Sequence, residues 1–179
     1  MLREITSEVS RVVGCGGMEF NSVNMNYFPP GGGVGFHADD EFLFDGINRH
    51  TRIISLSLCG RRRDDEDGGD VDETEHSGER IFQVKRKARP PVGSSSCGGI
   101  VSEITLRHGD IITMEGMFQC HYLHSVWPGD DDDRAHVNHE RCRGERINLT
   151  WRTIVRHLDG SDECRGLVCP LAAGEVGGE

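Results

Sequence analysis

Apolar residues are spaced as in a helix at the start of the chain and as in strands over most of the rest. Within residues 2–13, Leu2, Ile5, Val9 and Val12 recur every three to four positions, which predicts an amphipathic helix. From residue 20 onward, short apolar and β-branched runs are separated by glycine, proline and acidic residues, a pattern typical of strands. The predicted strands are 20–28, 34–39, 52–59, 80–85, 100–106, 110–115, 121–127 and 146–155. Many short strands behind one helix favour a mostly β fold, a sandwich or barrel.

The clearest alternation lies in the last predicted strand, RINLTWR, at residues 146–152. Its polar members are Arg146, Asn148, Thr150 and Arg152, and its apolar members are Ile147, Leu149 and Trp151. Because successive side chains point to opposite faces, all four polar groups share one face. The two arginines are separated by roughly 13 Å of strand, a spacing suited to holding a small dicarboxylate at both ends.

A second candidate for chemistry is the segment His37-Ala38-Asp39 on the predicted strand 34–39. Side chains two residues apart on a strand share a face, so the imidazole and the carboxylate can reach one metal ion. A third ligand has to come from elsewhere in the chain. Two histidines and one carboxylate leave metal positions open, as non-haem Fe(II) oxygenases require.

Charge is unevenly distributed along the 179 residues, which fit one domain. The net charge is −10, but residues 64–79 hold nine acidic side chains and 130–133 hold four more. Without those thirteen, 17 acidic residues remain against 20 basic ones. The chain outside these two acidic stretches therefore has a net charge of about +3, which does not exclude a polyanionic substrate.

No apolar run is long enough for a membrane span, and the start of the chain lacks the apolar core of a signal peptide. We therefore expect an intracellular protein, in the cytoplasm or nucleus, that is monomeric and has no membrane partner. The seven cysteines are odd in number and have no CxxC spacing, so we expect free thiols. A less favoured alternative is a zinc site drawn from Cys142, Cys164, Cys169, His136 and His139.

Five segments, in this order, resemble the AlkB family of 2-oxoglutarate- and Fe(II)-dependent dioxygenases. They are HADDE (37–41), SLSLCG (55–60), HGDIITMEG (108–116), HYLHSV (121–126) and RINLTWR (146–152). The resemblance covers residues 20–156, and the HxDDE and RxNxTxR motifs are its most specific parts. It implies a double-stranded β-helix (jelly-roll) core behind a short N-terminal helix.

The resemblance also implies a metal site for Fe(II) made by His37, Asp39 and His124. His121 is the rival third ligand. We prefer His124 because the family's ligand precedes a small or polar residue and a Val/Leu-Pro step, which HSVWP resembles.

For the co-substrate, the resemblance assigns Arg146 to the distal carboxylate of 2-oxoglutarate and Arg152 to the carboxylate near the metal. Asn148 and Thr150 would support the wall of that pocket. O2 would take the remaining metal position, and 2-oxoglutarate would be decarboxylated as a substrate C–H bond is hydroxylated.

Two further groups of residues follow from the family pattern. On the first strand an N-x-Y motif falls on Asn26-Tyr27-Phe28, so Asn26 would touch the co-substrate. Phe28 stands in place of the usual tyrosine, and Tyr27 should point to the opposite face. Asp40 and Glu41 occupy positions that face the substrate base in repair enzymes, although they also suit a solvated loop.

We expect oxidative N-demethylation of alkylated bases in DNA or RNA. The alternatives are a related oxygenase for a protein or small molecule, and an inactive binding or scaffold protein. The oxygenase domain should span 1–158, with acidic insertions at about 61–79 and 129–145 and a flexible tail at 159–179. Since about twenty residues precede the first strand, we expect either a fragment without an N-terminal lid or a different lid.

Overall fold

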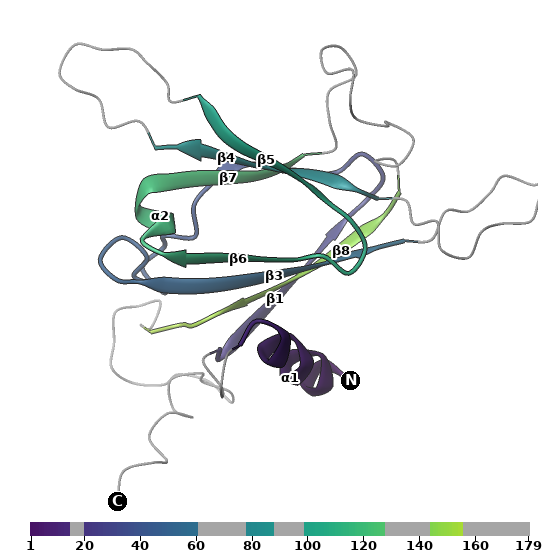
Figure 1. The fold of residues 1–179 in the computed structure, drawn as a ribbon, viewed down its shortest axis with the longest axis horizontal. Helices are drawn as coiled ribbons and strands as arrows, with labels where there is room; N and C mark the ends of the chain where they lie inside the picture. The colour runs from purple at the N-terminus through teal and green to yellow at the C-terminus, as the bar shows by residue number, and fades with distance from the viewer. Residues whose placement is uncertain (15–19, 61–77, 88–98, 128–143, 156–179) are drawn as a thin grey trace, which may run out of the picture.

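Two four-stranded antiparallel sheets face each other in the computed structural model, and one helix covers the outer side of one sheet (Figure 1). The structure describes residues 1–14, 20–60, 78–87, 99–127 and 144–155. The elements are α1 (Leu2–Val12), β1 (Ser22–Phe28), β2 (Val34–His37), β3 (Thr51–Cys59), β4 (Arg80–Arg86), β5 (Ile100–Leu106), β6 (Ile111–Gly116), α2 (Phe118–His121), β7 (Tyr122–Trp127) and β8 (Arg146–Arg152). The sheet orders are β1-β8-β3-β6 and β2-β7-β4-β5. This is the jelly-roll arrangement of a double-stranded β-helix.

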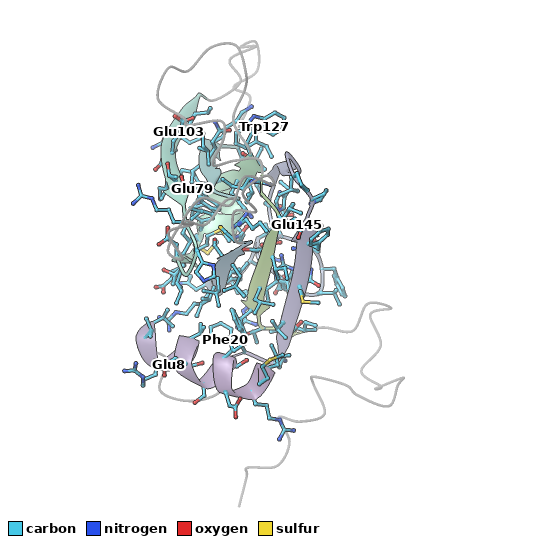
Figure 2. The ribbon with its side chains drawn as sticks, turned by 90° about the vertical axis from the view of Figure 1, so that its right-hand side faces the viewer. Glu8, Phe20, Glu79, Glu103, Trp127 and Glu145 are labelled. Atoms are coloured by element: carbon cyan, nitrogen blue, oxygen red, sulfur yellow. The ribbon has the colours of Figure 1, made fainter. Side chains whose placement is uncertain are left out.

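Helix α1 buries its apolar side against the first sheet. Val9 packs with Trp151 and the other outward-facing apolar residues of β3 and β8. Phe20 joins this outer cluster and lies beside the helix, whereas Glu8 points away from the sheet (Figure 2). The indole N–H of Trp151 donates to the hydroxyl of Thr6 at 2.9 Å, which fixes the helix along the sheet. The predicted helix is confirmed.

A second apolar cluster fills part of the space between the sheets. Its buried members are Ile53, Phe82, Val84, Leu106, Met114 and Val126. The inward face of β8 and the middle of β3 are polar instead, and they are also buried. The interior is therefore divided into an apolar half and a polar half, and the polar half contains the candidate site.

All eight predicted strands are present, but two end earlier than predicted. β2 ends at His37 and β8 ends at Arg152. The chain turns at residues 38–46, where Gly46 lies so close to the backbone of Asp39 that a Cβ atom would collide with it. The short helix α2 was not predicted, because four residues carry too little periodic signal.

Arg80, at the start of β4, joins segments that are far apart in sequence. Its side chain is completely buried, and its guanidinium donates to the carbonyls of Gly32 at 2.8 Å, Pro29 at 3.2 Å and Gly144 at 3.1 Å. It also donates to the carbonyl of Glu79 at 2.9 Å. The β1–β2 turn, the start of β4 and the residues before β8 are thus held by one side chain.

Several predictions lie mostly or wholly outside the described residues. They are the two acidic insertions, the tail and the alternative zinc site, which fall largely on 61–77, 128–143 and 156–179. The extent of the domain, 1–158, stays a prediction. None of the described helices is both long and apolar enough to cross a membrane.

Candidate active site between the two sheets

Two histidines and one aspartate meet at the end of β2. His37 is opposite His124 of β7 in the strand register, and their ring centroids are 4.3 Å apart. Asp39 follows the strand, and its Oδ2 lies 3.9 Å from Nε2 of His124. The prediction that Asp39 lies on the strand with His37 is wrong. The turn after His37 directs its carboxylate inward, and its backbone N–H donates to Oε1 of buried Gln119 at 2.9 Å.

The two candidate third ligands have different surroundings. His124 is 5% exposed, and its ring stacks on Phe82 with a centroid distance of 5.5 Å. His121 is exposed at the end of α2, where its backbone carbonyl accepts a hydrogen bond from Lys87. The structure brings His124, rather than His121, to His37 and Asp39.

Protonation in this cluster suits metal binding. Burial, together with the charges of His37 and Arg152, lowers the pKa of His124 to about 3, so its imidazole is neutral at neutral pH. Nδ1 of His37 is 2.8 Å from the carbonyl of Gly35, and because a carbonyl can only accept, Nδ1 is the nitrogen that carries a proton in this contact. Burial raises the pKa of Asp39, an effect that Arg152 and His37 oppose.

The donors fit Fe(II), although they do not form a closed metal cage. Within the described ranges, no three histidine, cysteine, aspartate or glutamate side chains are drawn together as a metal-binding group. Oδ2 of Asp39 and Nδ1 of His124 are nevertheless buried without a hydrogen-bond partner there. Unpaired buried polar atoms are costly, so a cation that pairs with Oδ2 of Asp39 would stabilise this cluster.

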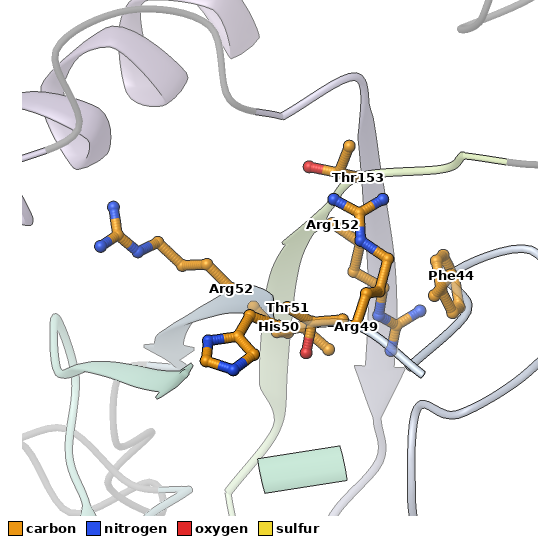
Figure 3. A pocket seen from close by; sticks show the side chains of 8 residues that line it. Phe44, Arg49, His50, Thr51, Arg52, Arg152 and Thr153 are labelled. Atoms are coloured by element: carbon orange, nitrogen blue, oxygen red, sulfur yellow. The ribbon is translucent and has the colours of Figure 1, made fainter. Parts of the chain in front are cut away.

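Arg152 connects the histidine–aspartate cluster to the end of β8. Its Nη2 donates to Oδ1 of Asp39 at 2.7 Å, and its guanidinium lies over the ring of Phe44 at 5.2 Å (Figure 3). This contact occupies one carboxylate oxygen and leaves the other facing His124. Arg152 therefore orients Asp39 in addition to any role toward a co-substrate.

Arg146, at the other end of β8, is a buried cation held by neutral partners. It is 1% exposed, and its Nη2 donates to Oγ of Ser57 at 2.8 Å and to Oδ1 of Asn148 at 3.2 Å. Asn148 also accepts from Ser55 and donates to Thr150, both at 2.8 Å. The polar face of β8 is thus one continuous hydrogen-bonded row.

The charge of Arg146 has no carboxylate partner within the described residues. Its Nε and Nη1 are buried and unpaired there, and burial lowers the pKa of the guanidinium to about 10. A buried guanidinium is stabilised most by a carboxylate that accepts two parallel hydrogen bonds. Nε and Nη1 lie on different edges of the guanidinium and cannot donate in parallel to one carboxylate, but each can donate one hydrogen bond to a carboxylate such as the distal one of 2-oxoglutarate.

In β1 the side chains are oriented as the sequence predicted. β1 pairs with β8 without a bulge, so that Asn26 is opposite Asn148 and Phe28 is opposite Arg146. Tyr27 is 57% exposed and points away from the site, as predicted. The ring of Phe28 lies 5.6 Å from the Arg146 guanidinium, a cation–π contact where the family's tyrosine would stand.

The two proposed substrate residues differ. Asp40 is paired with Lys87 at 2.5 Å, and the same ammonium donates to the carbonyl of Gln119 at 2.6 Å. Glu41 is exposed, and its backbone carbonyl caps the turn by accepting from Phe44 and Asp45. Asp40 is therefore fixed by a cation, whereas Glu41 is free to face an approaching ligand.

Sequence analysis missed Ser57, Gln119 and Lys87 as parts of the site. Ser57 had a signal, because serines alternate with leucines in SLSL at 55–58 and a polar inward face is unusual in a buried strand. Gln119 and Lys87 had none, because their partners, Asp39 and Asp40, are 80 and 47 residues away.

Comparison with known proteins agrees with this geometry. Residues 1–152 match the model of the 2OG-Fe(II) oxygenase superfamily. The DNA oxidative demethylase ALKBH2 of Arabidopsis thaliana is 30% identical over 161 residues, which cover 86% of this chain and 43% of the relative. The chain thus spans less than half the length of that relative.

Two solved structures have slighter likenesses. One is OsALKBH1, with a TM-score of 0.43, 16% identity, and coverage of 73% of this chain and 48% of the other. The other is a Pseudomonas putida prolyl-4-hydroxylase, with a TM-score of 0.38, 13% identity, and coverage of 87% and 62%. The family match over residues 1–152 decides the assignment: the chain is an AlkB-like member of the 2OG-Fe(II) oxygenase superfamily.

Proposed function

We propose that this chain is a 2-oxoglutarate- and Fe(II)-dependent dioxygenase that removes N-methyl groups from alkylated nucleic-acid bases. The observation that carries the proposal is the polar interior between the sheets. A buried arginine with two unpaired N–H groups lies at one end of β8, and two histidines and an aspartate lie near the other. These groups support the proposal, because a dicarboxylate would need the arginine and a metal ion would need the histidines and the aspartate.

Each residue has a definite role in this proposal. His37, Asp39 and His124 hold Fe(II), and Arg152 orients Asp39 through its bond to Oδ1. Arg146 binds the distal carboxylate of 2-oxoglutarate, since its remaining N–H groups have no other partner in the described part of the chain. Asn148, Thr150 and Asn26 would line the same wall of the pocket, where Asn26 is opposite Asn148.

When bound, Fe(II) and 2-oxoglutarate supply the oxidising chemistry, in which O2 is consumed, CO2 and succinate are released, and one oxygen atom enters a substrate C–H bond. The chain contributes position and exclusion of water. The apolar cluster around Phe82 and Val126 fills the other part of the interior, and apolar surroundings of this kind favour exclusion of water. An N-methyl group hydroxylated there would release formaldehyde.

The nucleic-acid substrate is supported by the similarity to a DNA oxidative demethylase and by the body's small excess of basic residues. The test is formaldehyde release from single-stranded oligonucleotides that carry N-methylated bases, with 2-oxoglutarate and Fe(II). We expect release that is abolished in Asp39→Ala. Succinate formation without formaldehyde would indicate an oxygenase for another substrate.

The oxygenase itself is tested without a substrate. Anaerobic addition of Fe(II) and 2-oxoglutarate should produce a visible absorption band that neither component gives alone. If no band appears while the protein is folded by circular dichroism, the chain is a binding or scaffold protein and the enzyme proposal is wrong.

A further inference from the structure

A small pocket lies beside Arg152, where β3 begins and β8 ends (Figure 3). Its volume is about 40 Å³, room for roughly three water-sized groups. It is lined by Phe44, Arg49, His50, Thr51, Arg52, Ile53, Arg152 and Thr153. The pocket therefore adjoins the residue that binds Asp39, but it is made mostly by residues with no assigned role in the reaction.

Two buried atoms of the lining residues have no hydrogen-bond partner among the described residues. They are Oγ1 of Thr51 and Nε of Arg152. An arginine nitrogen can only donate, and a threonine hydroxyl can donate or accept. An acceptor such as an oxyanion is therefore suited to both atoms.

The charge around the pocket favours an anion. Arg152 is matched by Asp39 at 2.7 Å, and Arg52 is matched by Glu115 at 3.0 Å. Arg49 is exposed and makes no ion pair with any described residue. One guanidinium of the pocket lining, that of Arg49, is thus not matched by a carboxylate of the described residues.

A wider open cavity of about 670 Å³ continues from the small pocket. Both are lined by Arg49, His50, Thr51, Arg52 and Thr153, and the wider one extends over Glu115 and Gly116. Pockets of about 300–1,000 Å³ hold ligands of drug size, although this cavity is an open one. The small pocket has room for the oxygens of one phosphate, and the open cavity has room for what that phosphate is attached to.

We infer that this pocket binds a backbone phosphate of the nucleic-acid substrate through Arg49, Thr51 and the Nε of Arg152. The inference rests on the proposed function and deepens it. Arginine side chains and hydroxyl groups are common phosphate contacts, and such contacts fix the register of a strand on a protein. Since Arg152 also binds Asp39, the phosphate is held one side chain away from the metal ligands, which sets where the neighbouring base enters.

The experiment measures binding apart from catalysis. Fluorescence anisotropy of a labelled, unmethylated single-stranded oligonucleotide is followed over a series of salt concentrations. Arg49→Gln should weaken binding at least fivefold at low salt and should reduce the slope of log K against log salt by about 0.7, the value for one phosphate contact. Arg3→Gln, which removes an exposed arginine of α1, is the matched control and should bind like the wild type.

Thr51→Val removes the unpaired hydroxyl with little change of shape. Loss of a buried group that has no partner should leave the melting temperature unchanged or higher, whereas oligonucleotide binding should fall severalfold. Lower stability with unchanged binding would mean that the hydroxyl is structural, and it would overturn the inference.

Further outcomes separate the sources of phosphate and the two proposals. Oligonucleotide binding unchanged in Arg49→Gln, or no binding by the wild type, overturns the phosphate site. If inorganic phosphate displaces the oligonucleotide and binds as tightly as the oligonucleotide does, the inference is also overturned, because the pocket would then be a site for a free anion. Arg49-dependent binding without formaldehyde release from any methylated oligonucleotide supports the site and contradicts the proposed reaction.

Discussion

At the scale of single residues, the candidate site is defined by atoms that are buried without partners. Oδ2 of Asp39 lies 3.9 Å from Nε2 of His124, and Nε and Nη1 of Arg146 lie at the other end of β8. The free energy of leaving such atoms unpaired is about 1–3 kcal/mol each, and more for charged groups. This unfavourable free energy is present in the protein without a ligand and is relieved when a ligand pairs with these atoms.

The choice of third metal ligand gives a prediction with a natural control. His124→Ala should weaken Fe(II) binding by more than the roughly 10–100-fold that loss of a supporting hydrogen bond costs, because a ligand itself is removed. His121→Ala, three residues away on an exposed position, should change it by no more than about twofold. Anaerobic Fe(II) titration measures both variants, with circular dichroism to verify folding. Comparable loss in the two variants would contradict the assignment.

At the scale of elements, the site depends on how three turns are held against the sheets. Arg80 binds carbonyls of the β1–β2 turn and of the residue before β8. Gln119, on the short helix α2, holds the backbone of Asp39, and Lys87 follows β4 and pairs with Asp40. These long-range bonds fix where β2 ends relative to β7 and β8, and hence where the candidate ligands meet.

The role of Arg80 predicts an unusually costly substitution. Arg80→Lys keeps the charge but loses the planar set of donors, so several buried carbonyls lose their partner and the ammonium is poorly solvated. We expect a loss of about 3 kcal/mol in the free energy of unfolding. The melting temperature should fall by roughly 6–12 °C.

The control for that prediction lies on the same strand. Arg86 is exposed at the end of β4, and Arg86→Lys should change the free energy of unfolding by less than about 0.5 kcal/mol. Thermal unfolding followed by circular dichroism compares the two. Equal shifts would mean that the carbonyl contacts of Arg80 contribute little.

At the scale of the whole molecule, the site joins the two sheets. β8 and β3 of one sheet carry the arginine and serine partners of the proposed co-substrate, and β2 and β7 of the other carry the histidines. A ligand that contacts both should resist separation of the sheets, so binding and unfolding should be linked.

This linkage predicts that Fe(II) and 2-oxoglutarate raise the melting temperature. A ligand at 100 times its dissociation constant adds about 2.7 kcal/mol to the free energy of unfolding. For a chain of this size that corresponds to roughly 5–10 °C. Scanning calorimetry under argon measures the shift for the metal alone and for both together.

Arg146→Met separates the two contributions. The variant should keep the shift caused by Fe(II), since the metal-side residues are unchanged, and should lose the further increment caused by 2-oxoglutarate. An increment as large as that of the wild type would show that Arg146 is not the carboxylate partner.

Structural features that depend on local periodicity could be predicted from the sequence. The apolar side of α1, the alternation of RINLTWR and the burial of the SLSL segment follow from neighbours in the chain, and the predicted helix and all eight strands are present. The HxDDE and RxNxTxR motifs also indicated which types of side chain form the site. A motif depends on the order of residues in the chain, so it can be recognised before the fold is known.

The contacts through which these residues are held together became visible in the folded structure. Asp39 reaches the site through a turn rather than along the strand, and His124, which the HSVWP segment already favoured over His121, is buried beside it. Ser57, Gln119 and Arg80 acquire their roles from partners 48 to 89 residues away. Such contacts depend on how the two sheets pack, and no periodicity within a segment of sequence encodes a partner at that distance.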